Sequence, residues 1–291
     1  MIRLVAAVIL LWLSAAQPAS LETRLRAIIQ QSGAEVALAF RTIDGDAEVL
    51  IAPDKSFHAA STMKVPVMIE LFRQAEAGTL RLDEPLPIRN EFRSIVDGSP
   101  YALSVGDDSD REVYARIGEQ MTLRALNEAM ITVSSNFATN LLIERVGAAN
   151  VRTTVSRLGG DGMVVLRGVE DTKAFEKGMN NATTARALMV LLEKLARGEA
   201  VGRRADAEMV NVLARQKFRD AIPAGVPAGT RVAHKTGTIT RIHHDAAIVY
   251  GRQPYVLVVL VRGIQDQTVS GRLIASISRE VWADVAGPQK P

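Results

Sequence analysis

The sequence contains no cysteine among its 291 residues. Disulfide bonds, thiol catalysis, thiolate metal sites and lipidation of a cysteine are therefore excluded. If the chain is exported, core packing alone must hold its folded state, and a hydrophobic content of 47% allows a sizeable core. Long runs of Lys or Arg are also lacking, although the net charge is +3 and the pI is about 9.3. Without such a run, the sequence gives no local sign of nucleic-acid binding.

The only long apolar run stands at the N-terminus. It covers Leu4–Leu13, follows Arg3 and precedes the small residues Ser14–Ala16. This order of charge, apolar run and small residues is typical of a secretory signal, and the run is too short to span a bilayer comfortably. We predict a signal peptide over residues 1–16, no stable membrane span in the mature chain, and a periplasmic or secreted protein. An uncleaved anchor is the alternative.

Both ends of the chain carry β-strand patterns. A predicted helix over Leu21–Gln31 precedes a hairpin of two strands. After residue 230, short β-branched runs predict three more strands and a closing amphipathic helix. The predicted strands and the last helix cover Glu35–Arg41, Ala47–Ile51, Arg231–Ile239, Ala246–Gly251, Tyr255–Gly263 and Thr268–Trp282. One antiparallel sheet built from both ends of the chain is therefore expected.

The middle of the chain carries helical patterns. Further helices are predicted over Thr122–Ile131, Ala138–Val146, Ala149–Leu158, Thr183–Leu195 and Ala205–Arg215. Two stretches, about Glu91–Asp110 and Gly159–Asn181, are expected to lack regular structure. The predicted fold is α/β in the α+β sense: an antiparallel five-stranded sheet flanked by the N- and C-terminal helices, with an inserted all-helical domain. Residues 20–56 plus 206–291 would form the sheet domain and residues 57–205 the helical domain, with a small-molecule cleft between them.

Ser61 and Lys64 stand where a loop enters an amphipathic helix that ends at Gly78. Three residues apart in a first turn, they share a face at the positive end of the helix dipole. A serine hydroxyl becomes a good nucleophile when a neighbouring base takes its proton, and a lysine with a lowered pKa can do so. A plain helix cap with a solvated lysine is the alternative interpretation.

Two further polar segments interrupt apolar elements. Ser134 and Asn136 lie between two predicted helices, where a hydroxyl could relay a proton and an amide could bind a carbonyl. Lys235-Thr236-Gly237-Thr238 lies in a predicted strand, where the first two side chains could bind a carboxylate. Gly237 would let a ligand approach the backbone closely. A simple turn and an ordinary edge strand are the alternatives.

The three motifs S-x-x-K, S-x-N and K-T-G occur once each and in this order. With the surrounding STMKVPVMIELF, MITVSSNFATNLLIERVG and HKTGT, the sequence resembles the class A β-lactamases and the related penicillin-binding serine acyltransferases from about residue 20 onward. The resemblance implies that Ser61 is the nucleophile, Lys64 its base or proton relay, and Ser134 the proton donor to the lactam nitrogen. It also implies that Asn136 contacts the substrate amide and that Lys235 and Thr236 bind the substrate carboxylate. The N–H groups of Ser61 and Thr238 would form the oxyanion hole.

The sequence also departs from the family pattern. The middle motif has Ser135 where the lactamases usually have an aspartate. The deacylating glutamate is best matched by Glu170, with Glu176 as a weaker rival, but Ala174 stands where the family has an asparagine four residues on. Arg241 or His243 could replace the family's carboxylate-binding arginine. His243, His244 and Asp245 do not predict a metal site, because adjacent residues on a strand point to opposite faces.

The resemblance implies a serine β-lactamase that acylates Ser61 and hydrolyses the ester with the help of Glu170. No cofactor is needed, the partner is a small-molecule β-lactam, and we expect a monomer. The alternative is a penicillin-binding D,D-peptidase, or another slowly deacylating acyltransferase, acting on peptidoglycan stem peptides. A non-catalytic cell-wall or β-lactam sensor is a third hypothesis, and it would require the N-terminal segment to be retained as a tether.

Overall fold

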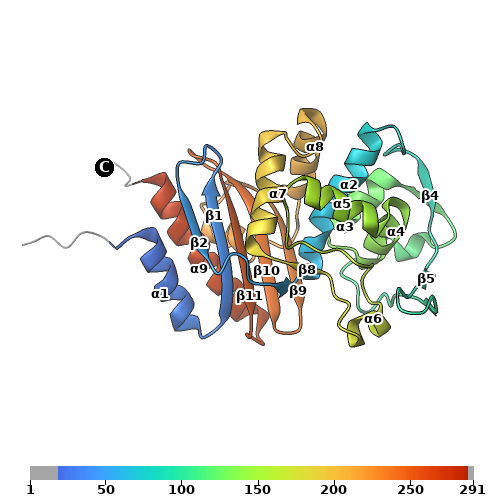
Figure 1. Cartoon of the computed structure of the whole chain (residues 1–291), viewed down its shortest axis with the longest axis horizontal. Helices are drawn as coiled ribbons and strands as arrows, with labels where there is room; N and C mark the ends of the chain where they lie inside the picture. Colours follow the sequence, from blue (N-terminus) through green and yellow to red (C-terminus); the bar gives the residue numbers. More distant parts are fainter. Residues whose placement is uncertain (1–18, 288–291) are drawn as a thin grey trace, which may run out of the picture.

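The computed structural model describes residues 19–287, and the predicted signal peptide lies outside that range. A five-stranded antiparallel sheet crosses the molecule, with strands in the order β2-β1-β11-β10-β9 (Figure 1). Strands from the two ends of the chain meet where β1 pairs with β11. The prediction of one sheet built from both ends is confirmed. The strands are β1 (Glu35–Thr42), β2 (Glu48–Ile51), β9 (Arg231–Ile239), β10 (Ile242–Tyr250) and β11 (Tyr255–Arg262).

The sheet is covered on both faces. Helices α1 (Leu21–Ser32) and α9 (Gln267–Ala286) lie together on one face (Figure 1), and Arg24 joins them through ion pairs to Glu280 and Asp284. Helix α7 (Ala185–Arg197) packs on the opposite face, against β1, β10 and β11. Because both faces are covered, β11 is buried along almost its whole length, which explains its nearly continuous run of Val and Leu.

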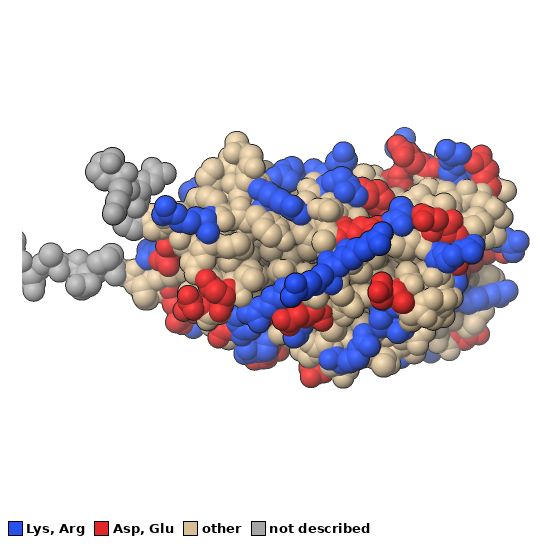
Figure 2. Space-filling model, turned by 90° about the horizontal axis from the view of Figure 1, so that it is seen from above, with Lys and Arg blue, Asp and Glu red and all other residues tan. Residues whose placement is uncertain are grey.

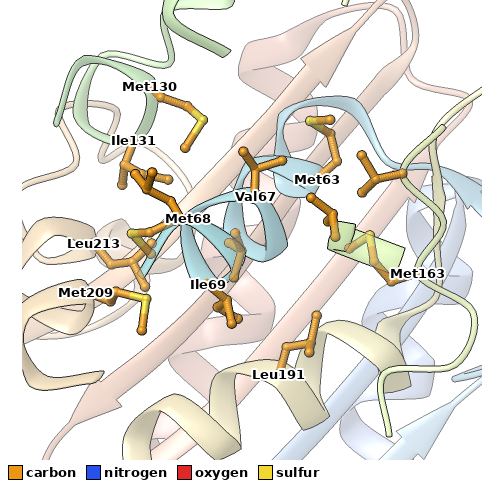
Figure 3. Packing of buried hydrophobic residues seen from close by; sticks show 14 of the residues in the cluster. Met63, Val67, Met68, Ile69, Met130, Ile131, Met163, Leu191, Met209 and Leu213 are labelled. Carbon is orange, nitrogen blue, oxygen red and sulfur yellow. The ribbon is translucent and has the colours of Figure 1, made fainter. Parts of the chain in front are cut away.

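The helical layer surrounds α2 (Lys64–Glu76). Around it pack α3 (Leu123–Thr132), α4 (Asn136–Val146), α5 (Ala148–Arg157) and α8 (Arg203–Leu213). Figure 3 shows Met63 of the preceding turn and Met68 of α2 in a core that includes Met130 and Met209. Flexible methionine side chains fill the irregular gaps between helices that meet at different angles.

The sequence predicts an amphipathic helix, which would be buried on one face only, but ten of the thirteen residues of α2 are buried. Two of these are charged. Glu70 is compensated by hydrogen bonds from Arg73, Gln74 and Thr154. Lys64 is compensated by acceptors from a neighbouring segment, described below. Charged side chains with such partners can be buried, so the apolar pattern alone underestimates how central the helix is.

Two stretches expected to lack regular structure contain short elements. The first carries the paired strands β5 (Phe92–Arg93) and β6 (Pro100–Tyr101), and the second carries α6 (Thr172–Glu176), capped by Asp171. Elements this short carry no readable periodicity. The remaining elements are β3 (Phe57–His58), β4 (Pro85–Pro87), β7 (Gln120–Thr122), β8 (Ala182–Thr183) and the 3-10 turns η1 (Ala60–Met63), η2 (Tyr114–Arg116) and η3 (Ile222–Gly225). The domain boundaries at residues 57 and 205 stay a prediction.

Charged side chains of both signs lie side by side on the face seen in Figure 2. Over residues 19–287, the structure has no helix that is both long enough and apolar enough to cross a bilayer.

Candidate active site

Ser61 lies in η1, the 3-10 turn that leads into α2. The preceding residue, Ala60, has a φ of 45°, an uncommon value for a residue other than glycine. Pro66 near the start of α2 fits this tight entry, because the first N–H groups of a helix have no partner within it. The half-buried Ser61 lines a cleft between the sheet edge and the helical layer.

Lys64 is fully buried beneath this cleft. Its ammonium donates to the carbonyl oxygen of Ser134 (2.7 Å), to Ser134 Oγ (3.1 Å) and to Asn136 Oδ1 (2.9 Å). Burial lowers the pKa of Lys64 to about 7, against the attraction of the carboxylates of Asp108 and Glu170. A lysine with this pKa is present as both amine and ammonium near neutral pH.

Ser134 is held between two lysines. Its Oγ accepts from Lys64 Nζ at 3.1 Å and from Lys235 Nζ at 3.0 Å. Lys235 reaches it from β9, is fully buried, and also donates to the carbonyl oxygen of Thr236. Burial and the nearby charge of Lys64 lower the pKa of Lys235 well below its ordinary value, while Asp245 opposes the shift. With both lone pairs occupied by ammonium donors, the Ser134 hydroxyl can direct its own proton elsewhere.

Glu170 is half-buried and also lines the cleft. Its Oε1 accepts from Asn136 Nδ2 at 2.8 Å. Burial raises its pKa, helped by the negative charges of Asp108 and Asp107, although the hydrogen bond from Asn136 acts against the shift. Its φ of 63° is unusual for a residue other than glycine, which marks a constrained position. The rival Glu176 is exposed at the end of α6 and does not line the cleft.

Gly237 allows β9 to approach η1. A Cβ at this position would lie 3.0 Å from the backbone N of Ser61 and 3.1 Å from that of Thr62. The close approach that we expected for a ligand is thus made by the chain itself. Thr236 and Thr238, on either side of Gly237, line the cleft together with Ser61.

His243 and Arg241 occupy different surroundings. His243 lines the cleft, and its Nδ1 is 3.1 Å from Ser270 Oγ of α9. The exposed Arg241 donates instead to the carbonyl oxygen of Gly263. Of the two candidates for carboxylate binding, the geometry favours His243. His244 contacts the carbonyl oxygen of His58 and the N–H of Val261 and does not itself line the cleft. In the described part of the chain, no group of His, Asp and Glu side chains is suited to hold a metal ion.

Sequence reasoning missed two residues at this site. Asn140, one turn into α4, accepts from the N–H of Val169 at 2.6 Å and donates to its carbonyl oxygen at 3.0 Å, which fixes the residue before Glu170. The sequence does contain a sign of this role, because an asparagine inside an apolar helix is buried and its amide then needs hydrogen-bond partners. Asp108, whose carboxylate accepts from the backbone N–H groups of Asn136 and Phe137, gave no comparable signal in its polar loop.

The cleft has two connected parts that share Ser61 and Asn136. The smaller part, about 220 Å³, reaches Ser134, Thr236 and His243. The larger part, about 710 Å³, extends past Glu170 toward α6. The arrangement places a hydroxyl, a lysine of lowered pKa, a second hydroxyl and a carboxyl group around one accessible space, as nucleophilic acyl transfer requires.

Comparison with known proteins agrees with this geometry. The model of the Beta-lactamase2 family, described as the beta-lactamase enzyme family, matches residues 20–285. The chain is 29% identical over 277 residues to beta-lactamase Toho-2 of Escherichia coli, covering 91% of this chain and 89% of that protein. Among solved structures, a point mutant of PBP-A, captured as its acyl-enzyme with penicillin G, superposes with a TM-score of 0.79 at 27% identity, covering 91% of this chain and 96% of that one. An ancestral class A beta-lactamase superposes with a TM-score of 0.77 at 25% identity, covering 90% and 98%. The chain therefore belongs to the beta-lactamase enzyme family and is a serine hydrolase of the class A type.

Proposed function

We propose that the protein hydrolyses β-lactams in two steps, acylation of Ser61 and hydrolysis of the resulting ester. The observation that carries the proposal is the position of Ser134 Oγ, within 3.1 Å of the ammonium groups of both Lys64 and Lys235. Three motifs that are far apart in the sequence supply these groups. A helix cap or an edge strand would not require two buried ammonium groups to share one hydroxyl.

In acylation, neutral Lys64 takes the proton of the Ser61 hydroxyl as Oγ attacks the lactam carbonyl carbon. The developing oxyanion is bound by the N–H groups of Ser61 and Thr238. The C–N bond then breaks, and Ser134 donates its proton to the departing nitrogen. Lys64 returns a proton to Ser134, so Lys64 is neutral again at the end of the step and no proton is lost.

Lys64 must release one of its hydrogen bonds to act in this way. As an ammonium it has three donors and uses all of them on Ser134 and Asn136. Loss of one proton frees a lone pair, and the weakest of these contacts by length is the one to Ser134 Oγ at 3.1 Å. Because the pKa of Lys64 is about 7, loss of this proton costs little free energy near neutral pH.

In deacylation, Glu170 takes a proton from a water molecule as the water oxygen attacks the ester carbon. Ser61 Oγ then leaves and takes up the proton that Glu170 removed from the water, so Glu170 is ionised again and the product is the ring-opened acid. Asn136 holds the Glu170 carboxylate toward the cleft through the 2.8 Å hydrogen bond. Carboxylate recognition falls to Thr236 and His243, which line the smaller part of the cleft, and to Lys235, which is buried against Ser134.

Steady-state measurement with a chromogenic cephalosporin tests the proposal. We expect sustained turnover of many equivalents per enzyme molecule. A single burst of one equivalent would contradict hydrolysis and favour the alternative, a penicillin-binding D,D-peptidase or slowly deacylating acyltransferase. One observation favours that alternative: Ala174 cannot offer the second polar contact to a deacylating water that an asparagine would provide. Release of D-alanine from a stem-peptide substrate would then identify the peptidase.

We further propose that the mature protein is exported and acts as a monomer, after removal of about residues 1–16. N-terminal sequencing of the exported protein should begin beyond residue 16. A retained first residue would contradict cleavage and favour an anchored protein.

A further inference from the structure

The first turn of α4 has an unusual arrangement of caps. Ser135 is its N-cap, and Ser135 Oγ accepts from the N–H of Ala138 at 3.2 Å. The N–H groups of Asn136 and Phe137 also lack partners within the helix. They donate to the two carboxylate oxygens of Asp108, at 3.0 and 2.9 Å. The helix thus takes its negative charge from a residue 28 positions earlier in the chain.

The loop that carries Asp108 is tied to the same segment a second time. Ser109 Oγ donates to the carbonyl oxygen of Val133 at 2.6 Å. The loop therefore holds the chain on both sides of Ser134. Ser109 contacts Val133 before it, and Asp108 contacts Asn136 and Phe137 after it. Ser134 needs this support, because a φ of 60° is a strained backbone conformation for a residue other than glycine.

The residues held in this way are central to the proposed chemistry. Ser134 places its hydroxyl between the two lysines, and Asn136 contacts both Lys64 and Glu170. The middle residue of this motif, an aspartate in the usual class A pattern, is Ser135 here, which carries no charge. We infer that Asp108 is a positioning residue that supplies the missing carboxylate from the neighbouring loop and sets the positions of Ser134 and Asn136.

Asp108 also acts on the site through its charge. Its carboxylate raises the pKa of Lys64 and, by repulsion, that of Glu170. The other charged groups that act on Glu170 are Asp107, which raises its pKa, and Lys64, which lowers it. Removing the charge of Asp108 should therefore lower the pKa of both groups, an effect that loss of packing alone would not produce.

The inference rests on the proposed hydrolysis, and the Asp108→Asn variant tests it. Asparagine keeps the shape but can accept only one of the two N–H groups and carries no charge. We expect kcat/KM for benzylpenicillin to fall roughly 10- to 100-fold, because misplaced catalytic groups are costly. We also expect the acid limb of the pH profile of kcat/KM to move to lower pH. The double variant Asp108→Asn/Ser135→Asp should recover much of the lost rate, since it returns a carboxylate to the same helix end.

Asp110→Asn is the matched control. Its carboxylate accepts N–H groups of Glu112 and Val113 within its own loop, so the variant should lower the melting temperature without moving the pH limb. Asp108→Glu retains the charge and should keep the limb in place if Asp108→Asn fails to fold. Equal rates and equal limbs in Asp108→Asn and the wild type would overturn the inference, as would the same limb shift in Asp110→Asn. Absence of turnover in the wild type would instead contradict the proposed function.

Discussion

The side-chain amide of Asn136 donates a hydrogen bond to Oε1 of Glu170 at 2.8 Å. The oxygen of the same amide accepts from Lys64 at 2.9 Å. One side chain therefore contacts the group that we propose for acylation and the group that we propose for deacylation. Its orientation follows from these contacts, because the ammonium form of Lys64 can only donate and the ionised carboxylate of Glu170 can only accept.

Replacement of Glu170 should separate the two steps. In Glu170→Gln the side chain can still contact Asn136 but cannot accept a proton from water. We expect kcat for benzylpenicillin to fall about 10²- to 10⁴-fold and KM to fall with it, because the acyl-enzyme accumulates. Glu176→Gln is the control, since Glu176 is exposed at the end of α6, and it should stay within about twofold of the wild type. A larger effect of Glu176→Gln would reverse the assignment.

The rate of acylation should depend on pH through Lys64. Its pKa is lowered to about 7 by burial, and only the neutral amine can take the proton of Ser61. We therefore expect kcat/KM to rise with pH and to level off above pH 7. Lys64→Arg should lose most of the activity, because a guanidinium does not deprotonate in this range. A wild-type limb well below pH 7 would point to the Glu170 carboxyl group as the base for acylation.

The same lysine should be visible in the stability of the fold. Between about pH 7 and its ordinary pKa of 10.5, Lys64 is protonated in the unfolded chain and largely neutral in the folded one. The unfolded state then binds more protons, so the free energy of unfolding rises with pH across this window. We expect urea unfolding to show that the free energy of unfolding of the wild type, relative to that of Lys64→Met, increases from pH 7 to pH 10. A constant difference would mean that Lys64 keeps an ordinary pKa.

His243 should contribute to binding of the substrate carboxylate. We expect His243→Ala to raise KM for benzylpenicillin roughly tenfold with a smaller effect on kcat, the size of one charge-assisted hydrogen bond. His243→Arg should keep KM near the wild-type value. Arg241→Ala is the matched control, because Arg241 donates to the carbonyl oxygen of Gly263 and does not line this part of the cleft. A larger rise in KM for Arg241→Ala than for His243→Ala would contradict the assignment.

The sequence predicts the long elements of the fold well. Alternating and β-branched runs identify all five strands of the sheet, and turn residues separate them. For β10 the prediction begins at Ala246, whereas the strand begins at Ile242. The buried polar residues His243, His244 and Asp245 explain the difference, because each has a partner that its own local sequence does not reveal.

The site is only partly predictable. Ser61, Lys64, Ser134 and Lys235 stand in recognisable motifs, and their side chains or backbones meet in one region. Asp108 gives no such signal, because its function depends on a contact between segments that no local pattern encodes. The φ of Glu170 is likewise set by packing, through the hydrogen bonds of Asn140 to Val169.

Locating the acyl group on the protein tests the central claim most directly. Glu170→Gln is mixed with benzylpenicillin, quenched in acid, digested and sequenced by tandem mass spectrometry. Ring opening expels no leaving group, so the adduct should carry the whole mass of the penicillin. We predict that it resides on Ser61 and is absent from Ser61→Ala treated in the same way. An adduct on any other residue, or the same adduct in Ser61→Ala, would contradict the proposed mechanism.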